Sequence, residues 1–146
     1  MAQPPAPLNL LKLSVGTDSV EDLMNWHDSP QGQGPDGLPR HVTRMWPRRA
    51  DELLQGGSIY WVIQGHIQCR QRILRLDEVV RADGIRRCAI VLDRDLIRTA
   101  TVVKRPFQGW RYLAGADAPP DLSRTHRDDD AIPASLSAAL ADIGVL

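Results

Sequence analysis

The chain has 146 residues with 18 basic and 18 acidic side chains, and 42% of its residues are hydrophobic, which is the balance of one globular domain. No apolar run approaches the roughly 18 residues that a membrane helix needs. The start MAQPPAPLNLL also lacks the basic end and long apolar core of a signal peptide. We therefore expect a single cytoplasmic domain over residues 1–146 with no membrane partner.

The charges are distributed unevenly along the neutral chain. Residues 40–113 carry fourteen arginines and one lysine against seven acidic residues, a net charge of +8, whereas residues 1–39 and 114–146 each carry −4. A basic body of this kind attracts anionic partners. Arginine, which supplies sixteen of the eighteen basic residues, binds phosphate and carboxylate with two parallel hydrogen bonds. A GC-rich genome is an equally good explanation of the arginine excess.

Residues 8–15 alternate apolar and polar side chains and predict a first strand. A helix should follow, capped by Asp18 with Glu21 three residues later. Its buried face is predicted to contain Val20, Leu23, Met24 and His27. A single histidine on such a face is more typical of a packed core residue than of a ligand. Residues 28–40 are rich in Gly and Pro and predict a mobile surface loop.

Residues 41–46 predict a strand that stops at Pro47, which is suited to the first position of a short helix ending at Gly56. This helix would hold Arg48 and Arg49 in its first turn, where the helix dipole disfavours cations. Backbone N–H groups and guanidinium groups would then point the same way, as in an anion site. The alternative is a solvated basic rim.

Residues 58–76 predict a β-hairpin that turns at Gln64 and Gly65, so that Ile63 pairs with His66. Regular alternation then predicts one core face with Tyr60, Val62, Ile67, Cys69 and Ile73. The other face would hold Ile59, Trp61, Ile63, His66, Gln68, Arg70 and Arg72. Such a mixed face could stack unpaired bases, or it could be half-buried with arginine stems packed over Trp61.

Residues 86–93 predict a central strand, followed by a turn at 93–95 and another strand at 96–103. Residues 104–111, KRPFQGWR, repeat the proline, aromatic and arginine pattern of residues 44–49, RMWPRR. Residues 115–132 are polar and predict a partly disordered segment, and residues 133–144 predict a short amphipathic helix.

Cys69 and Cys88 are 19 residues apart, with no second Cys or His at metal-ligand spacing beside either. We expect reduced, buried thiols rather than a disulfide or a zinc site. The elements together predict an α+β fold with a curved, mostly antiparallel sheet or incomplete β-barrel and two or three short helices.

The blocks GGSIYWVIQGHIQCRQRIL, RRCAIVLD and RPFQGWRYL, in this order, resemble an uncharacterised domain-of-unknown-function family of alphaproteobacterial proteins along nearly the whole chain. This resemblance implies a bacterial cytosolic protein and supplies no catalytic residue. A short helix ending in Gly-Gly before an arginine-bearing, strand-rich body is also similar to small pseudo-barrels of the PUA and ASCH kind. That second likeness implies binding of RNA or a modified nucleotide by analogy of fold.

No catalytic, metal or cofactor motif is present in the sequence. The leading hypothesis is a non-catalytic domain that binds RNA or a nucleotide-like anion. Its predicted site residues are Arg44, Arg48, Arg49, Trp61, Arg70, Arg72, Arg105, Trp110 and Arg111. One alternative is a small phosphoester or nucleotide hydrolase that uses His41 or His66 with Asp51 or Glu52. The other alternative is an interaction module for an acidic protein partner.

Overall fold

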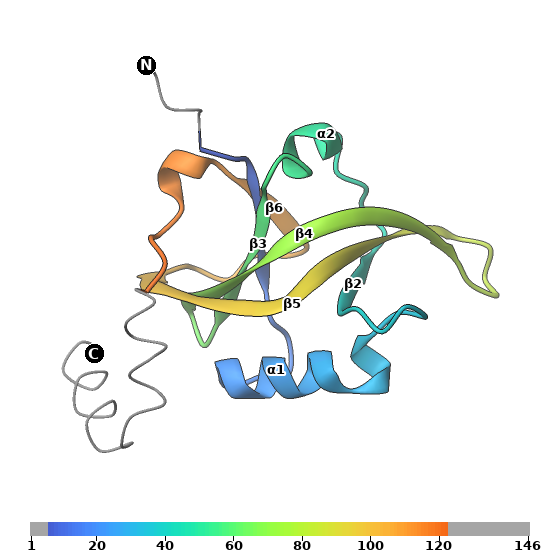
Figure 1. The fold of residues 1–146 in the computed structure, drawn as a ribbon, viewed down its shortest axis with the longest axis horizontal. Helices are drawn as coiled ribbons and strands as arrows, with labels where there is room; N and C mark the ends of the chain where they lie inside the picture. Colours follow the sequence, from blue (N-terminus) through green and yellow to red (C-terminus); the bar gives the residue numbers. More distant parts are fainter. Residues whose placement is uncertain (1–5, 123–146) are drawn as a thin grey trace.

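Six strands form one sheet in the computed structural model, which describes residues 6–122 (Figure 1). The sheet order is β2-β5-β4-β3-β1-β6, and every pairing is antiparallel except that of β1 with β3. The strands are β1 (Asn9–Leu13), β2 (Arg40–Thr43), β3 (Ser58–Ile63), β4 (His66–Val80), β5 (Arg86–Val103) and β6 (Trp110–Leu113). The helices of this part of the chain are α1 (Val20–Asp28) and α2 (Ala50–Leu53), with 3₁₀ turns at Pro30–Gly32 and Gly115–Asp117. An α+β fold with a curved, open and mostly antiparallel sheet is therefore confirmed.

The hairpin of β3 and β4 turns at Gln64 and Gly65, as predicted, with φ angles of 52° and 79°. Ile63 pairs with His66, but Trp61 pairs with Cys69 while Val62 pairs with Ile67. Gln68 is therefore an extra residue in β4, and such a bulge reverses the alternation beyond it.

The predicted sorting of the hairpin side chains over two faces is wrong because of this bulge. Cys69 and Ile73 pack in the same cluster as Trp61, and Tyr60 and Ile67 pack on the other face. All six residues of β3 are buried, so β3 is covered on both of its faces.

β4 and β5 form a long twisted ribbon of 15 and 18 residues that extends past the other strands (Figure 1). The turn predicted at 93–95 is wrong, because β5 runs through these residues without a break. Gln71 pairs with Leu96 and Ile73 with Leu92, so residues 93–95 lie opposite a single residue of β4. The Asp-rich segment makes a local bond from the Asp95 N–H to Asp93 Oδ1 (2.9 Å), yet it forms a bulge and does not end the strand.

The main core lies on the α1 side of the sheet. It contains buried residues of five strands and both helices, including Leu10, Val20, Leu23, Leu53, Ile59, Trp61, Ile73, Ile90, Leu92 and Trp110. A smaller cluster on the other face contains Leu11, Tyr60, Val62, Ile67 and Leu113. Cys69 and Cys88 are free and fully buried, in agreement with the expected reduced thiols.

The two edges of the curved sheet contact each other through side chains. Trp110 Nε1, on β6, donates to the Met45 carbonyl just after β2 (2.9 Å). The Arg49 N–H donates to Tyr112 Oη, also on β6 (3.0 Å). The sheet thus bends far enough for its edge segments to meet without backbone pairing.

Both helices begin later than the sequence predicts. The cap of α1 is Ser19, whose Oγ accepts from the Asp22 N–H (3.1 Å), so the cap prediction at Asp18 is one residue early. Met24 is 43% exposed and lies off the buried face, contrary to the prediction. The cap position of α2 is Arg49, so Arg48 and Arg49 are not in its first turn, which instead carries Asp51 and Glu52. Acidic residues suit the positive end of a helix dipole, which explains this later start.

Helices of the described residues are too short and too polar to cross a membrane. Residues 28–40 contain the 3₁₀ turn at Pro30–Gly32 and a bridge between Gln33 and Pro39. In the segment predicted to be polar and partly disordered, Asp121 bridges to Thr99 of β5. The helix predicted at 133–144 and residues 123–132 of that polar segment lie outside the described residues.

Candidate functional site

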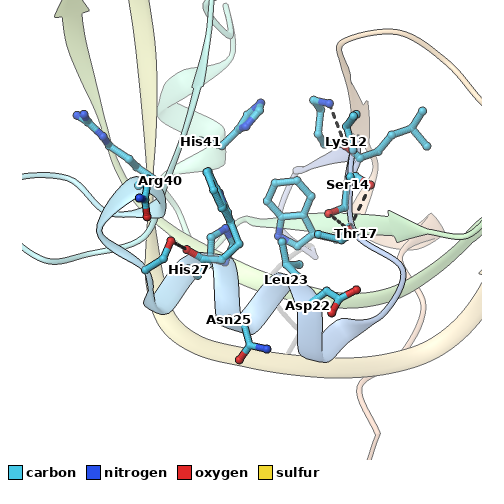
Figure 2. Close-up of a pocket in the computed structure, with 16 residues that line it drawn as sticks. Lys12, Ser14, Thr17, Asp22, Leu23, Asn25, His27, Arg40 and His41 are labelled. Carbon is cyan, nitrogen blue, oxygen red and sulfur yellow. Dashed lines mark hydrogen bonds between the residues drawn. The ribbon is translucent and has the colours of Figure 1, made fainter.

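A cavity of about 1000 Å³ lies between α1 and the sheet, at the end of β1 (Figure 2). Arg40 and His41 stand on one side of it, Lys12 and Ser14 stand on the opposite side, and α1 contributes Leu23 and His27. We call it the histidine cavity; its lining includes Lys12, Trp26, His27, Arg40, His41 and Trp61.

Three features of the chain build this cavity. The parallel pairing of β1 with β3 places Lys12 directly beside Trp61 on the sheet. The pairing of β2 with β5 places His41 opposite Ile90. The buried face of α1, through Val20 and Leu23, packs on the main core and holds the helix over the sheet. The site is therefore assembled from segments that are distant in sequence.

The two histidines flank the indole of Trp61. The His27 ring lies 5.9 Å from the Trp61 ring, between centroids, at a tilt of 54°, and the His41 ring lies 5.8 Å from it edge-on. His27 is only 4% exposed, and its Nδ1 has no hydrogen-bond partner among residues 6–122. His27 is packed in the core, as predicted. It is also left with one unsatisfied nitrogen, an arrangement that is uncommon in native proteins.

Burial lowers the pKa of His27 to about 4, and the nearby Asp28 carboxylate opposes this shift only partly. Burial likewise lowers the pKa of His41 to about 4, and the positive charge of Lys12 and the proximity of His27 lower it further. Both imidazoles are therefore neutral near pH 7. The pKa of Lys12 is also lowered by burial.

Lys12 and Arg40 supply the positive charge of the cavity. Lys12 Nζ donates to the Leu13 carbonyl (2.9 Å). Neither Lys12 nor Arg40 forms an ion pair with a carboxylate of residues 6–122. Asp22 at the rim accepts from the Asp18 N–H (3.0 Å). The cavity thus combines two cations that have no carboxylate partner in the described part of the chain with two neutral, proton-accepting rings.

Some of the residues predicted from the sequence meet in a second hollow of about 550 Å³. We call it the arginine groove; it is lined by Met45, Trp46, Arg48, Trp110, Arg111 and Tyr112. The two segments with the proline, aromatic and arginine pattern, 44–49 and 104–111, therefore lie against each other. Arg48 and Arg111 share this groove, whereas Arg105 is exposed and does not line it.

The remaining predicted arginines lie elsewhere or have partners. Arg49 binds Glu52 through two hydrogen bonds (2.7 and 2.8 Å) and lies over the Tyr112 ring. Arg70 binds Asp121 through two bonds of 2.7 Å and also donates to Ser58 Oγ (2.8 Å). Exposed Arg72 pairs with Ser58 across the hairpin.

Arg44 is exposed beyond the end of β2; the hydrogen bond from Arg87 is the main cause that lowers the pKa of Asp83, and the charge of Arg44 adds to it only as the smallest cause. The predicted arginines thus do not gather on a single face.

The predicted aromatic residues are buried. Trp61 is 3% exposed and Trp110 is 7% exposed, so neither presents a free ring face to solvent. Trp61 instead forms part of the histidine cavity. Trp26, which sequence reasoning missed, is 49% exposed at the same cavity. Trp26 lies on α1 outside the buried face formed by Val20, Leu23 and His27, and a tryptophan predicted on an exposed helix face could have been recognised from the sequence as a candidate.

Sequence reasoning also missed Lys12 and Arg40. Lys12 is the single cation of the first strand, and it alternates with Leu10 so that both project toward the main core side. A lysine at such a position is a usable signal, because lysine is rarely placed on a core-facing position without a reason. Nothing near Arg40 in the sequence indicates its place in the cavity.

The residues of the hydrolase hypothesis are distributed over the histidine cavity, the hairpin tip and α2, which carries Asp51 and Glu52. His66 Nδ1 lies 3.0 Å from the Gln64 carbonyl at the hairpin tip, whereas His41 lines the cavity. Glu52 is engaged by Arg49 on α2. Within the described part of the chain, no three His, Cys, Asp or Glu side chains are grouped so that they could hold a metal ion.

Comparison with known proteins identifies a family for this chain. Residues 10–146 match the family described as protein of unknown function (DUF1489). No curated protein and no solved structure matches the chain significantly. The match covers nearly the whole chain, so the protein belongs to this domain-of-unknown-function family.

Proposed function

We propose that the protein is a non-catalytic binding domain for a small, nucleotide-like anion, which it holds in the histidine cavity. One observation carries the proposal: Lys12 and Arg40 enter the same cavity as Trp26 and Trp61, and neither cation has a carboxylate partner among residues 6–122.

Electrostatics supports an anionic ligand. A charge in a partly buried site interacts more strongly with an opposite charge than it does in water. Six of the fourteen arginines among residues 6–122 already form an ion pair with a carboxylate, as Arg70 does with Asp121. Lys12 and Arg40 have no such partner among these residues and stand on opposite sides of the cavity (Figure 2), so both would attract an anion bound inside it.

The aromatic lining supports a ligand with a flat, apolar part. Trp26, half-exposed at the cavity, is the ring available to such a group, whereas Trp61 is enclosed in the cavity wall between the two histidines. A volume of about 1000 Å³ lies at the upper end of the range of small-molecule sites, roughly 300–1000 Å³. A nucleoside with one or two phosphates has this combination of a planar base and negative charge.

The test is a binding titration with the four nucleoside monophosphates, the corresponding nucleosides and inorganic phosphate. We expect at least one monophosphate to bind more tightly than its nucleoside and more tightly than phosphate alone. Lys12→Met and Arg40→Met, which keep much of each side-chain stem, should each weaken binding roughly 10-fold or more. Arg105→Met is the matched control, because Arg105 is exposed and lines neither hollow.

Two results would overturn the proposal. The first is the absence of binding by every monophosphate. The second is binding that Lys12→Met and Arg40→Met leave unchanged.

The arginine groove supports a second candidate function, which is binding of single-stranded RNA. Arg48 and Arg111 line the groove together, and neither forms an ion pair within residues 6–122. The affinity for RNA should then fall steeply as the salt concentration rises. The double variant Arg48→Ala with Arg111→Ala should reduce this affinity, whereas Lys12→Met and Arg40→Met should leave it unchanged. Undetectable affinity at low salt would exclude this function. If the chain instead captures an acidic protein and the complex survives nuclease treatment, the hypothesis of an interaction module for an acidic protein partner is favoured.

A further inference from the structure

The histidine cavity contains two imidazoles that the proposed function does not yet use. His27 and His41 both line it, and both rings approach the Trp61 indole at just under 6 Å. His27 Nδ1 is buried and lacks a partner among residues 6–122. A neutral imidazole has one nitrogen that donates and one that accepts, whereas an imidazolium donates from both. Because His27 Nδ1 is itself closed off from solvent, a protonated ring here would attract an anion in the cavity through its positive charge.

The charges around these rings explain why they are neutral without ligand. From β1, Lys12 adds positive charge beside His41, and from β2 Arg40 lies next to it in the chain. From α1, Asp28 favours protonation of His27, and Asp22 lies at the rim. Burial outweighs the carboxylates, so each pKa lies near 4. An anion bound among these groups would add negative charge beside the rings and so favour their protonated form.

We propose that the anionic group of the ligand lies against His27 and His41, and that these side chains take up protons from solvent as the ligand binds. This inference rests on the proposed function and names where its anion is held and how pH controls binding. A negative charge stabilises the imidazolium form and raises the pKa of each ring in the complex. The affinity should therefore increase as the pH falls toward the pKa of the free rings.

The expected size of the change in affinity with pH follows from proton linkage. At pH values between the pKa of a ring in the free protein and its higher pKa in the complex, binding takes up a proton. Each proton taken up then raises the affinity by up to about tenfold for every pH unit by which the pH is lowered. A probe for this effect must not titrate in the same range. Cyclic UMP is suitable, because its phosphodiester and its uracil do not change charge between about pH 5 and about pH 8.

The experiment is isothermal titration calorimetry of the full chain with cyclic UMP at about pH 5.5 and about pH 7.5. At each pH, two buffers with different ionisation enthalpies give the number of protons taken up. We expect tighter binding at the lower pH, by roughly 10-fold, and net proton uptake. His27→Gln and His41→Gln, whose amide side chains do not titrate, should reduce both effects. His66→Gln, at the hairpin tip, is the matched control and should leave both unchanged.

The outcomes separate the two proposals. Binding with the same affinity at both pH values and without proton uptake would overturn the proton coupling alone. The absence of cyclic UMP binding at both pH values would overturn the proton coupling, whereas the proposed function fails only if none of the four nucleoside monophosphates binds either. The buffer comparison uses the unmodified protein, so the result does not depend on whether either glutamine variant folds.

Discussion

Gln71 is a polar side chain in the middle of the main core, with 1% of its surface exposed. Its Oε1 accepts from Trp61 Nε1 (2.9 Å), and its Nε2 donates to the Asp93 carbonyl in β5 (3.1 Å). Gln71 therefore fixes the indole that forms the wall of the histidine cavity. It also ties β4 to the bulge of β5.

Gln71→Leu should lower the free energy of unfolding by about 1–3 kcal/mol, because it leaves the Trp61 N–H and the Asp93 carbonyl buried without their partner. Urea unfolding of the wild type and the variant measures this difference. Gln55→Leu, at an exposed position, is the control and should change the free energy of unfolding by less than about 0.5 kcal/mol. An unchanged unfolding midpoint for Gln71→Leu would contradict the assigned bonds.

Cys69 and Cys88 should be unreactive in the folded protein. Burial raises the pKa of the Cys69 thiol to about 12 and that of Cys88 to about 11. Both side chains have 0% exposure, so the thiolate is scarce and the reagent has no access. A colorimetric disulfide reagent at neutral pH should label both thiols only after denaturation. Rapid labelling of either thiol in the native protein would show that the β4–β5 ribbon opens.

The hairpin turn is strained at its first residue. Gln64 is the single non-glycine residue with a positive φ angle, 52°, among the described residues. Its side chain donates to Asp18 Oδ1 (2.9 Å) at an exposed position. The left-handed conformation costs most residues roughly 1 kcal/mol, whereas asparagine and glycine tolerate it.

Gln64→Asn should therefore raise the free energy of unfolding by roughly 0.5 kcal/mol, because the turn sequence becomes Asn-Gly, the favoured one for this type of hairpin. Gly65→Ala is the opposite case and should lower it by about 1 kcal/mol, since the φ angle there is 79°. Thermal unfolding monitored by circular dichroism gives both values. If both variants shifted stability in the same direction, the turn geometry would be wrong.

Helix α1 contributes both to the main core and to the histidine cavity. Its buried face packs Val20 and Leu23 into the main core, and the next turn of that face places His27 in the cavity. The periodicity of the sequence predicts this face but not which sheet residues it meets. Those partners come from β1, β2 and β3, which the chain order does not reveal.

The stability of the whole molecule should depend on the two buried histidines. Their folded pKa, about 4, lies below the usual value of 6.5. The unfolded chain thus binds protons that the folded protein excludes, and stability is lost as the pH falls from about 6.5 toward about 4. The loss is on the order of 3 kcal/mol for each histidine. Carboxylates whose pKa is lowered by an arginine, such as Asp83, contribute to the loss of stability only at lower pH.

Urea unfolding between about pH 7 and about pH 4.5 measures this dependence. His27→Gln should remove about half of the decrease, because glutamine does not titrate. His66→Gln, at the exposed hairpin tip, should leave the decrease unchanged. A free energy of unfolding that stays constant over this range would show that the histidines are already solvated in the folded state.

The charge pattern of the whole chain predicted basic surfaces but not their arrangement. Arg48 and Arg111 meet because the sheet bends until β6 contacts the segment after β2. Arg70 belongs to the same basic body, yet it is engaged by Asp121. Whether an arginine is free depends on which carboxylate the fold brings near it, and this is set by long-range packing.

Short stretches of the amino-acid sequence were enough to specify the local features of the fold. The Gln64-Gly65 turn, the buried face of α1 and the apolar run in β5 depend on backbone preferences and side-chain periods within a few residues. Tertiary structure alone decided the bulge at Gln68, which moved Cys69 to the Trp61 face, because a shift of one residue in strand register reverses every side chain beyond it. It also decided the histidine cavity, because Lys12, His27 and His41 come together only through strand pairing and helix packing between distant segments.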